Sequence, residues 1–95
     1  MAAYIIVQID IQDAEKFERY RAMVPPTLEP FGGRYIVRGG NAETLEGDWA
    51  PKRVVVLEFP DRDQAKRWLE SDVYREARAL RHAAAHSDSI VVDGV

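Results

Sequence analysis

Two arginines stand four residues apart in the segment Gly32 to Gly40, whose sequence is GGRYIVRGG. Arg34 and Arg38 flank a short apolar run that is typical of a β-strand. Alternate residues of a strand share one face, so both guanidinium groups are predicted on the same face. The planar guanidinium fork suits a carboxylate or an enolate. This strand is therefore the first candidate for an anion-binding site.

Two carboxylates are predicted near these arginines. If the second and third strands pair as an antiparallel hairpin, Arg34 lies beside Glu58 and Arg38 lies near Val54. Asp10, at the end of the first strand, then lies at the same end of the sheet as Arg38, roughly 10 Å away between backbones. Asp10 and Glu58 are the candidate catalytic bases. To act as a base near neutral pH, either carboxyl group would need a pKa raised by burial. The alternative is that these charged residues form structural ion pairs at an interface.

Two further side chains could complete a site beside the arginines. Gln8 is predicted on their face of the sheet, where it could orient a ligand or form a hydrogen bond across a dimer. Trp49, in the loop sequence EGDWAP, is either an anchor packed beside the sheet or a lid over a cavity. The candidate ligand-binding residues are therefore Arg38, Gln8, Trp49 and Arg34.

The only two histidines, His82 and His86, are four residues apart on the expected last helix. This spacing can chelate a metal ion. However, Arg78 precedes them on the same helical stripe, and Asp88 is the one further ligand nearby. We therefore expect structural or exposed histidines, and a protein with neither a metal ion nor another cofactor.

Composition narrows the class of protein. The 95 residues suit a single domain, here residues 1–95, with 46% hydrophobic residues and a net charge of −3. The acidic balance argues against a nucleic-acid surface. No cysteine is present, which excludes disulfides and thiolate chemistry. The N-terminus has no basic start and no long apolar run, so we expect a soluble, cytoplasmic protein.

The apolar periodicities predict four strands and two helical regions. The strands are expected at Tyr4–Ile11, Arg34–Arg38, Arg53–Phe59 and Ser89–Val92. The first helix should follow Asp13 as N-cap, with Pro25 and Pro26 interrupting it or starting a second segment, and Gly32-Gly33 as its C-cap. The second helical region should open at Pro60-Asp61 and continue, after a cap at Ser71 or Asp72, with Tyr74, Ala77, Leu80 and Ala84 on its inner stripe. Residues 42–51 are expected to form a connection that leaves the sheet between two strands.

The order β-α-β-β-α-β favours an α+β, ferredoxin-like sandwich with antiparallel strand order 4-1-3-2 and both helices on one face. Ile5, Val7, Ile9 and Ile11 should face the helices, as should Tyr35 and Val37. The other face would then carry Arg34, Ile36 and Arg38 beside Ile6, Val54 and Val56. Such an apolar face predicts a homodimer joined sheet to sheet, with the arginines lining a cleft inside it.

The stretches VPPTLEPFGGRYIVRGG, LEGDWAPKRVVVLEFP and WLESDVYREARALR, with VVDGV at the end, closely resemble the DUF1330 family. The resemblance covers nearly the whole chain. It implies membership of the dimeric α+β barrel superfamily, in which two ferredoxin-like subunits pack sheet to sheet. Relatives in that superfamily include cofactor-free monooxygenases, lactone isomerases and haem enzymes, but the family itself implies no established activity.

Two function classes follow. The first is a cofactor-free enzyme that acts on a small organic acid, a lactone or an enolisable compound in the cleft between the sheets. The second is a non-catalytic dimeric module that binds a small anion or has a purely structural role. An enclosed polar cavity beside Arg38 would support a site, and a solid apolar interface would remove it.

Overall fold

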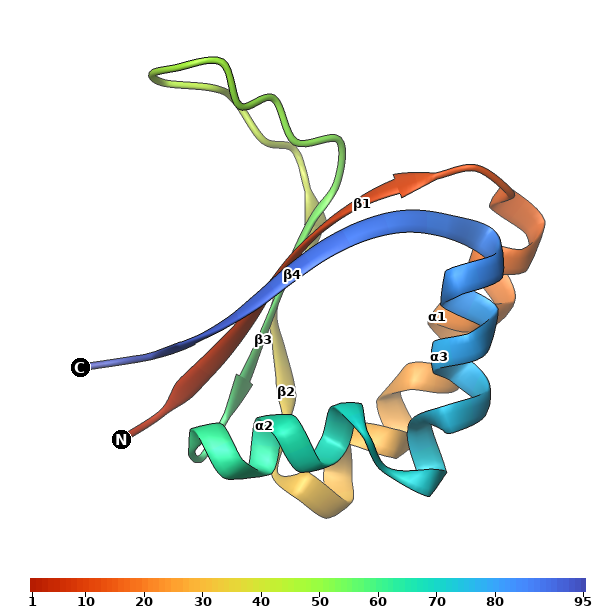
Figure 1. The fold of residues 1–95 in the computed structure, drawn as a ribbon, viewed down its shortest axis with the longest axis vertical. Helices are drawn as coiled ribbons and strands as arrows, with labels where there is room; N and C mark the ends of the chain where they lie inside the picture. Colours follow the sequence, from red (N-terminus) through yellow and green to blue (C-terminus); the bar gives the residue numbers. More distant parts are fainter.

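A computed structural model describes all of residues 1–95. One antiparallel sheet carries its helices on a single face (Figure 1). In chain order the elements are β1 (Ala3–Ile11), α1 (Ala14–Leu28), the short 3-10 helix η1 (Glu29–Phe31), β2 (Arg34–Gly40), β3 (Val54–Phe59), α2 (Arg62–Leu69), α3 (Asp72–Ala84) and β4 (Ala85–Asp93). None of these helices has the length and apolar character that crossing a membrane requires.

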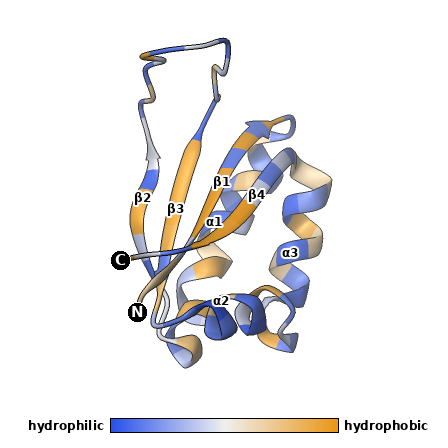
Figure 2. Ribbon diagram, turned by 60° about the vertical axis from the view of Figure 1, so that its left-hand side comes forward, coloured by the Kyte–Doolittle hydropathy of each residue, from blue (hydrophilic) through white to orange (hydrophobic).

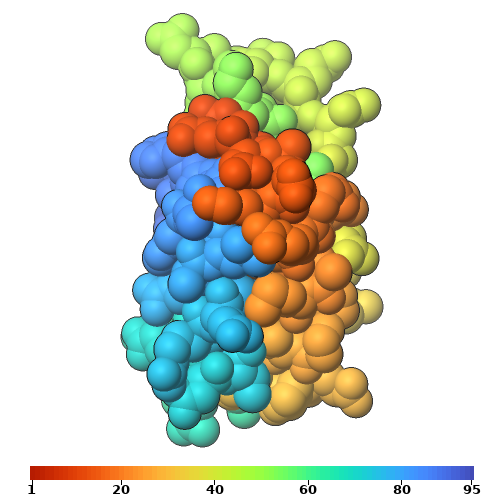
Figure 3. Space-filling view, turned by 90° about the vertical axis from the view of Figure 1, so that its right-hand side faces the viewer, coloured from red at the N-terminus to blue at the C-terminus, as the bar shows by residue number.

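The sheet order is β2-β3-β1-β4, with every neighbouring pair antiparallel. This confirms the predicted order, read from the opposite edge. The two longest helices, α1 and α3, lie side by side and form the outer layer (Figure 3). The other face of the sheet has no helix on it (Figure 2).

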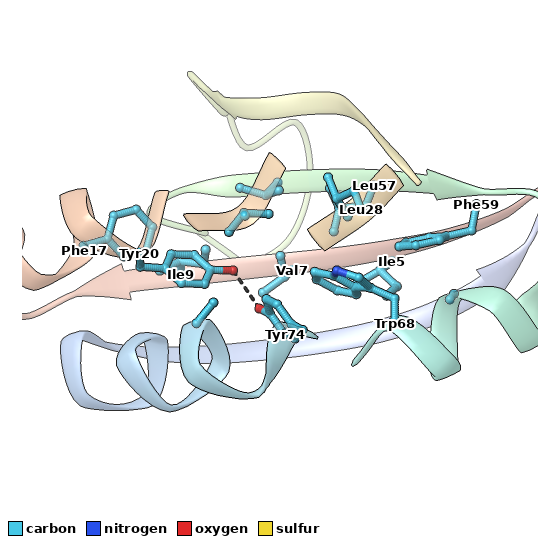
Figure 4. Close-up of a cluster of buried hydrophobic side chains, with 14 of the residues drawn as sticks. Ile5, Val7, Ile9, Phe17, Tyr20, Leu28, Leu57, Phe59, Trp68 and Tyr74 are labelled. Carbon is cyan, nitrogen blue, oxygen red and sulfur yellow. Dashed lines mark hydrogen bonds between the residues drawn. The ribbon is translucent and has the colours of Figure 1, made fainter. Parts of the chain in front are cut away.

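The core lies between the sheet and the helices (Figure 4). Ile5, Val7 and Ile9 of β1 are buried at alternate positions, as the strand period requires. Trp68 and Tyr74 are the largest fully buried side chains, and their rings lie 4.0 Å apart between centroids. The indole N–H of Trp68 donates to Thr27 Oγ1 at 3.0 Å, so its one polar atom is paired.

Three side chains act as helix N-caps, as the sequence indicates. Asp13 accepts a hydrogen bond from the backbone N–H of Lys16, and Asp61 does the same for Gln64. Ser71, rather than Asp72, caps α3. Each cap satisfies a backbone donor that has no partner within its helix. Gly32, with φ of 69°, closes η1 in the left-handed region and confirms the predicted stop.

Two element boundaries differ from the sequence-based predictions. Pro25 and Pro26 lie inside a continuous α1 instead of interrupting it. The last strand begins at Ala85, four residues before the predicted Ser89, because it pairs with β1 along its whole length. His86 is consequently a strand residue. The two histidines do not share a helix.

Strand β2 contains two irregularities that change which face its residues occupy. Val37 pairs with Val56 and Arg38 pairs with Val55, with register shifts after Tyr35 and after Arg38. Val55 is buried on the helix side of β3. Arg38 therefore lies on the helix face and Val37 on the open face, the reverse of the prediction for both. An extra residue in a β-bulge reverses the alternation of every residue that follows it.

The second irregularity depends on Gly39. Its φ of 75° lies in the left-handed region, and an added Cβ would overlap the guanidinium of Arg53. Gly40 has no such conformation, and an added Cβ there would meet Val37 at an ordinary 3.9 Å. Gly39 thus allows both the bulge and the close approach of Arg53.

We predict that Gly39→Ala lowers the free energy of unfolding by about 1–2 kcal/mol, the cost of a left-handed conformation for a residue with a Cβ. Gly40→Ala should change it by less than about 0.5 kcal/mol. Urea unfolding of the two variants measures both values. Equal effects at the two positions would contradict the assigned bulge.

Candidate functional site

A small cavity of about 30 Å³ lies between the sheet and the helices. Its apolar wall comes from the central strands, from Phe17 of α1 and from Trp68 of α2. Its polar lining consists of four arginines, two tyrosines and one serine: Arg21, Arg38, Arg53, Arg81, Tyr20, Tyr35 and Ser89. No aspartate, glutamate or histidine lines it. Every charged residue in the lining is therefore a cation.

The four arginines reach the cavity from four separate parts of the chain. Arg21 lies on α1, Arg38 on β2, Arg53 just before β3, and Arg81 on α3. Of these, Arg21 alone forms a salt bridge, with Glu18 at 2.9 Å. The other three have no carboxylate partner, and a bound anion would offset the unfavourable proximity of their like charges.

Aromatic rings hold two of the guanidinium groups at the rim. Arg38 Cζ lies 4.6 Å from the centre of the Tyr35 ring, and Arg53 Cζ lies 5.4 Å from that of Phe17. The negative face of an aromatic ring attracts a cation at such distances. The Nε of Arg53 is buried and has no hydrogen-bond partner. Both side chains are therefore positioned without being neutralised.

Arg81 is the most deeply buried of the four, with 9% of its surface exposed. Its Nη1 donates to the Tyr74 hydroxyl at 3.0 Å, and that hydroxyl lies 2.8 Å from the hydroxyl of Tyr20. The Tyr20–Tyr74 bond is drawn in Figure 4. The Nε of Arg81 is also buried, and it has no hydrogen-bond partner. A buried cation with neutral partners alone is costly, so this position is suited to an incoming anion.

Two tyrosines near the cavity, Tyr35 and Tyr74, are neutral at physiological pH. Burial raises the pKa of Tyr35 to about 12. Burial also raises the pKa of Tyr74 far above the usual range, and the nearby Tyr20 raises it further. These hydroxyls can donate hydrogen bonds, but neither is a base near neutral pH.

The predicted catalytic bases lie outside this cavity. Glu58 accepts hydrogen bonds from Arg34 Nε at 2.7 Å and from the Tyr4 hydroxyl at 3.1 Å on the open face. The contact with Arg34 confirms the predicted cross-strand pair. Hydrogen bonds from Arg34 and then Tyr4 lower the pKa of Glu58, whereas a general base needs it raised. Asp10 pairs with His86 of β4 and is not among the lining residues.

Arg38 and Asp10 are therefore not partners across one face, because the bulge in β2 moves Arg38 to the other side of the sheet. Arg34 stays on the open face with Glu58, away from the cavity. Of the four predicted ligand-binding residues, the structure places Arg38 alone in the lining.

Gln8 and Trp49 lie elsewhere. The Gln8 side chain donates to Asp88 at 3.2 Å and accepts from the backbone N–H of Lys52 at 3.4 Å. Trp49 is 66% exposed in the loop between β2 and β3, so it is not packed beside the sheet. That loop projects beyond the sheet, in green at the top of Figure 1. Within the loop, the Thr44 hydroxyl donates to the Trp49 carbonyl at 2.8 Å.

Sequence reasoning missed Arg21, Arg53 and Arg81. A signal for Arg81 existed: Tyr74, Ala77, Arg81 and Ala84 are the buried positions of α3, spaced as one helical stripe. The prediction from sequence placed the apolar Leu80 on that stripe in place of Arg81, and so it missed the buried arginine. Arg53 stood at a predicted strand boundary, where nothing indicated its direction.

The strand order and the one-sided helical layer define a ferredoxin-like α+β fold. The chain belongs to the DUF1330 family, a domain of unknown function whose model matches residues 2–95, and this confirms the resemblance seen in the sequence. No curated protein matches the sequence.

Solved structures of low sequence identity share the fold. The RPA0582 protein of unknown function from Rhodopseudomonas palustris is 22% identical, with a TM-score of 0.80 over 99% of this chain and 82% of that one. A dimeric ferredoxin-like protein of unknown function from Jannaschia sp. CCS1 is 11% identical, with a TM-score of 0.73 over 99% and 100%. SnoaB, a cofactor-independent oxygenase from Streptomyces nogalater, is 13% identical, with a TM-score of 0.67 over 99% and 93%.

We predict that Glu58 titrates below the usual carboxyl range, and that Arg34→Gln raises its pKa. Because the folded-state pKa is lowered, the pair stabilises the protein above the unfolded pKa, about 4.3. This contribution is lost as pH falls through the folded pKa. NMR-detected titration of the Glu58 carboxyl carbon measures the shift, and an unchanged pKa in Arg34→Gln would refute the pairing.

Proposed function

We propose that this protein binds a small organic anion with an apolar body in the cavity between the sheet and the helices. One observation carries the proposal: four arginines line an apolar cavity whose lining contains no carboxylate. The apolar walls suit a ring or a short hydrocarbon chain, and the guanidiniums suit a carboxylate or an enolate. The cleft between two sheets, which the sequence suggested, is not the site in this proposal.

The ligand would enter already ionised, or with a proton acidic enough to be lost to water. The lining offers no carboxylate or imidazole base, and the neighbouring tyrosines are neutral. The guanidiniums would still favour the ionised form of a bound acid, because nearby positive charge lowers the pKa of an acid. Carboxylic acids and enolisable β-dicarbonyl compounds meet this requirement.

Binding would require the rim to open. A volume of about 30 Å³ holds water but no organic anion. Arg38 is exposed and Arg53 half-buried, so both side chains can swing outward from the rings that they cover. The cation–π contacts that such a movement breaks are each worth about 0.5–1 kcal/mol at exposed sites. A charge-assisted contact with the ligand can offset this cost.

A cofactor-free enzyme acting on the same class of compound is the second candidate. The similarity of fold to SnoaB, described as a cofactor-independent oxygenase, favours it. In such a reaction the arginines would stabilise an enolate, because fixed donors aimed at developing charge lower its energy. The lack of a base in the lining makes binding the leading proposal.

We predict that benzoate, phenylacetate or the enolate of 1,3-cyclohexanedione raises the melting temperature of the protein. Arg53→Gln and Arg38→Gln should each weaken binding about 10- to 100-fold, because hydrogen bonds to charged groups contribute about 1.5–3 kcal/mol. Isothermal titration calorimetry measures the affinities.

Arg62→Gln is the matched control, since Arg62 pairs with Asp93 outside the cavity, at 3.1 Å. It should bind as the unmodified protein does. If none of the three probes binds at millimolar concentration, or if Arg62→Gln weakens binding equally, the proposed site is wrong. Turnover of bound 1,3-cyclohexanedione under oxygen would move the assignment from binding module to enzyme.

We also propose that two copies of the chain pack through their open sheet faces. Apolar side chains cover that face on all four strands: Ile6, Val37, Val54, Val56, Ile90 and Val92, with Ile36 beside them at 46% exposure. An apolar face of this breadth is unfavourable in water. The neighbour from Jannaschia sp. CCS1 is described as dimeric, which supports the same assembly here.

The loop at residues 41–53 supports the same partner. It bends away from α1 and α3, toward the open side of the sheet (Figure 1). Leu45 is 88% exposed and Trp49 is 66% exposed on it. Large apolar side chains on a projecting loop can lose their contact with water against a second subunit. In this proposal Trp49 is an interface residue.

We predict a dimer in light scattering, with twice the mass of one 10.8 kDa chain. Val56→Asp should dissociate it, because an unpaired carboxylate in an apolar interface costs about 3–5 kcal/mol. Val73→Asp is the control: Val73 is 55% exposed on α3, so this variant should remain dimeric. A monomer of the unmodified protein at micromolar concentration would disprove the assembly.

A further inference from the structure

A second, more polar hollow of about 380 Å³ opens where α3 meets β4. Its lining contains two arginines, two histidines and two serines: Arg78, Arg81, His82, His86, Ser87 and Ser89. Leu69 and Ala85 complete it. No carboxylate lines it, and the nearby Asp88 lies 4.0 Å from His86 Nε2, so the two arginines give the hollow a net positive charge.

The two guanidinium groups of the hollow lack counter-ions. Neither Arg78 nor Arg81 forms a salt bridge, and the Nε of each is buried without a hydrogen-bond partner. Arg81 is only 9% exposed, and its protein partners are the neutral Tyr74 hydroxyl and His82. Buried cations are normally paired, so an anion from outside would stabilise Arg81 in particular.

His82 adds a group that responds to charge in the hollow. Its Nε2 lies 3.2 Å from Nη2 of Arg81. Partial burial, followed by the charges of Arg81 and Arg78, lowers the pKa of His82. Arg81 and Arg78 thus place positive charge beside this ring, and a bound anion would offset it.

We propose that this hollow binds a tetrahedral oxyanion, namely phosphate or the phosphoryl group of a phosphate ester. Guanidinium groups and serine hydroxyls all donate hydrogen bonds, and here they come from two elements, the arginines from α3 and the serines from β4. Donors from several directions suit a four-oxygen dianion better than a planar carboxylate. Arginines in pairs are a common means of phosphate recognition.

The histidine pair does not make this hollow a metal site. Two guanidiniums beside the rings repel a cation. No group of three histidine or acidic side chains in the chain could hold a metal ion. The same charges that exclude a metal ion favour an oxyanion.

The hollow and the central cavity share Arg81, Ser89 and Leu69, but Arg78 and His82 belong to the hollow alone. The phosphate site can therefore be tested separately from the proposed organic-anion site, although Arg81 lines both. Substitution of Arg78 tests the hollow, and substitution of Arg53 tests the cavity.

The experiment is a titration of the full-length protein with inorganic phosphate and with sulfate, by calorimetry. Arg78→Gln should weaken binding of both at least 10-fold. Arg75→Gln is the matched control, because Arg75 lies one turn earlier on α3, is exposed and pairs with Asp72 outside the hollow. Arg53→Gln should leave phosphate affinity unchanged, which separates this result from the fate of the organic-anion site.

NMR of the unmodified protein provides a readout that needs no variant. The ring proton signals of His82 should shift on addition of sulfate at constant pH. The proposal is overturned if neither anion binds at millimolar concentration, if the His82 signals do not move, or if Arg75→Gln loses affinity as much as Arg78→Gln.

A third titration, with phenyl phosphate, distinguishes the two sources of the phosphoryl group. Equal affinities for phenyl phosphate and phosphate indicate a site for free phosphate. Phenyl phosphate that binds more tightly than phosphate, but not in Arg53→Gln, indicates a single ligand whose ring reaches the central cavity past Arg81. Either result supports the site, provided that Arg78→Gln weakens binding at least 10-fold.

Discussion

Placement of arginines around an apolar cavity whose lining holds no carboxylate is the constraint on which the rest of this structure depends. A small α+β sandwich has one core, and here that core also contains four arginines at its edge. Glu18 pairs with Arg21. The other three contact aromatic rings or, in the case of Arg81, the Tyr20–Tyr74 hydroxyl pair. These contacts are weaker than ion pairs, so the positive potential remains available to an anion.

The two faces of the sheet have separate roles under the proposals made above. The helix face carries both anion sites, and the open face carries the apolar surface for assembly. Charge follows the same division. On the open face, Arg34 is neutralised by Glu58, whereas on the helix face Arg38 has an aromatic neighbour instead of a carboxylate. A site and an interface can therefore exist on one thin sheet without competing for the same residues.

Arg81 connects the two anion sites, since it lines both. Its position on the buried stripe of α3 makes it part of the packing as well as of the electrostatics. An anion on either side of this guanidinium would change the potential on the other side, because the group lies where little water screens it. Two ligands in these sites would consequently be coupled in affinity.

Much of the architecture follows from the sequence alone, because its causes are local. Alternation in β1, the caps Asp13 and Asp61, and the left-handed Gly32 depend on neighbouring residues only. The order of elements and the right-handed crossovers then leave one strand order, and with it the Arg34–Glu58 pair. Tertiary structure decided the site. The bulges in β2 exist only through pairing with β3, and they reverse the face of Arg38, which strict alternation had assigned to the open side. The meeting of Arg21, Arg53 and Arg81 joins residues far apart in the chain, and no local pattern encodes such a convergence.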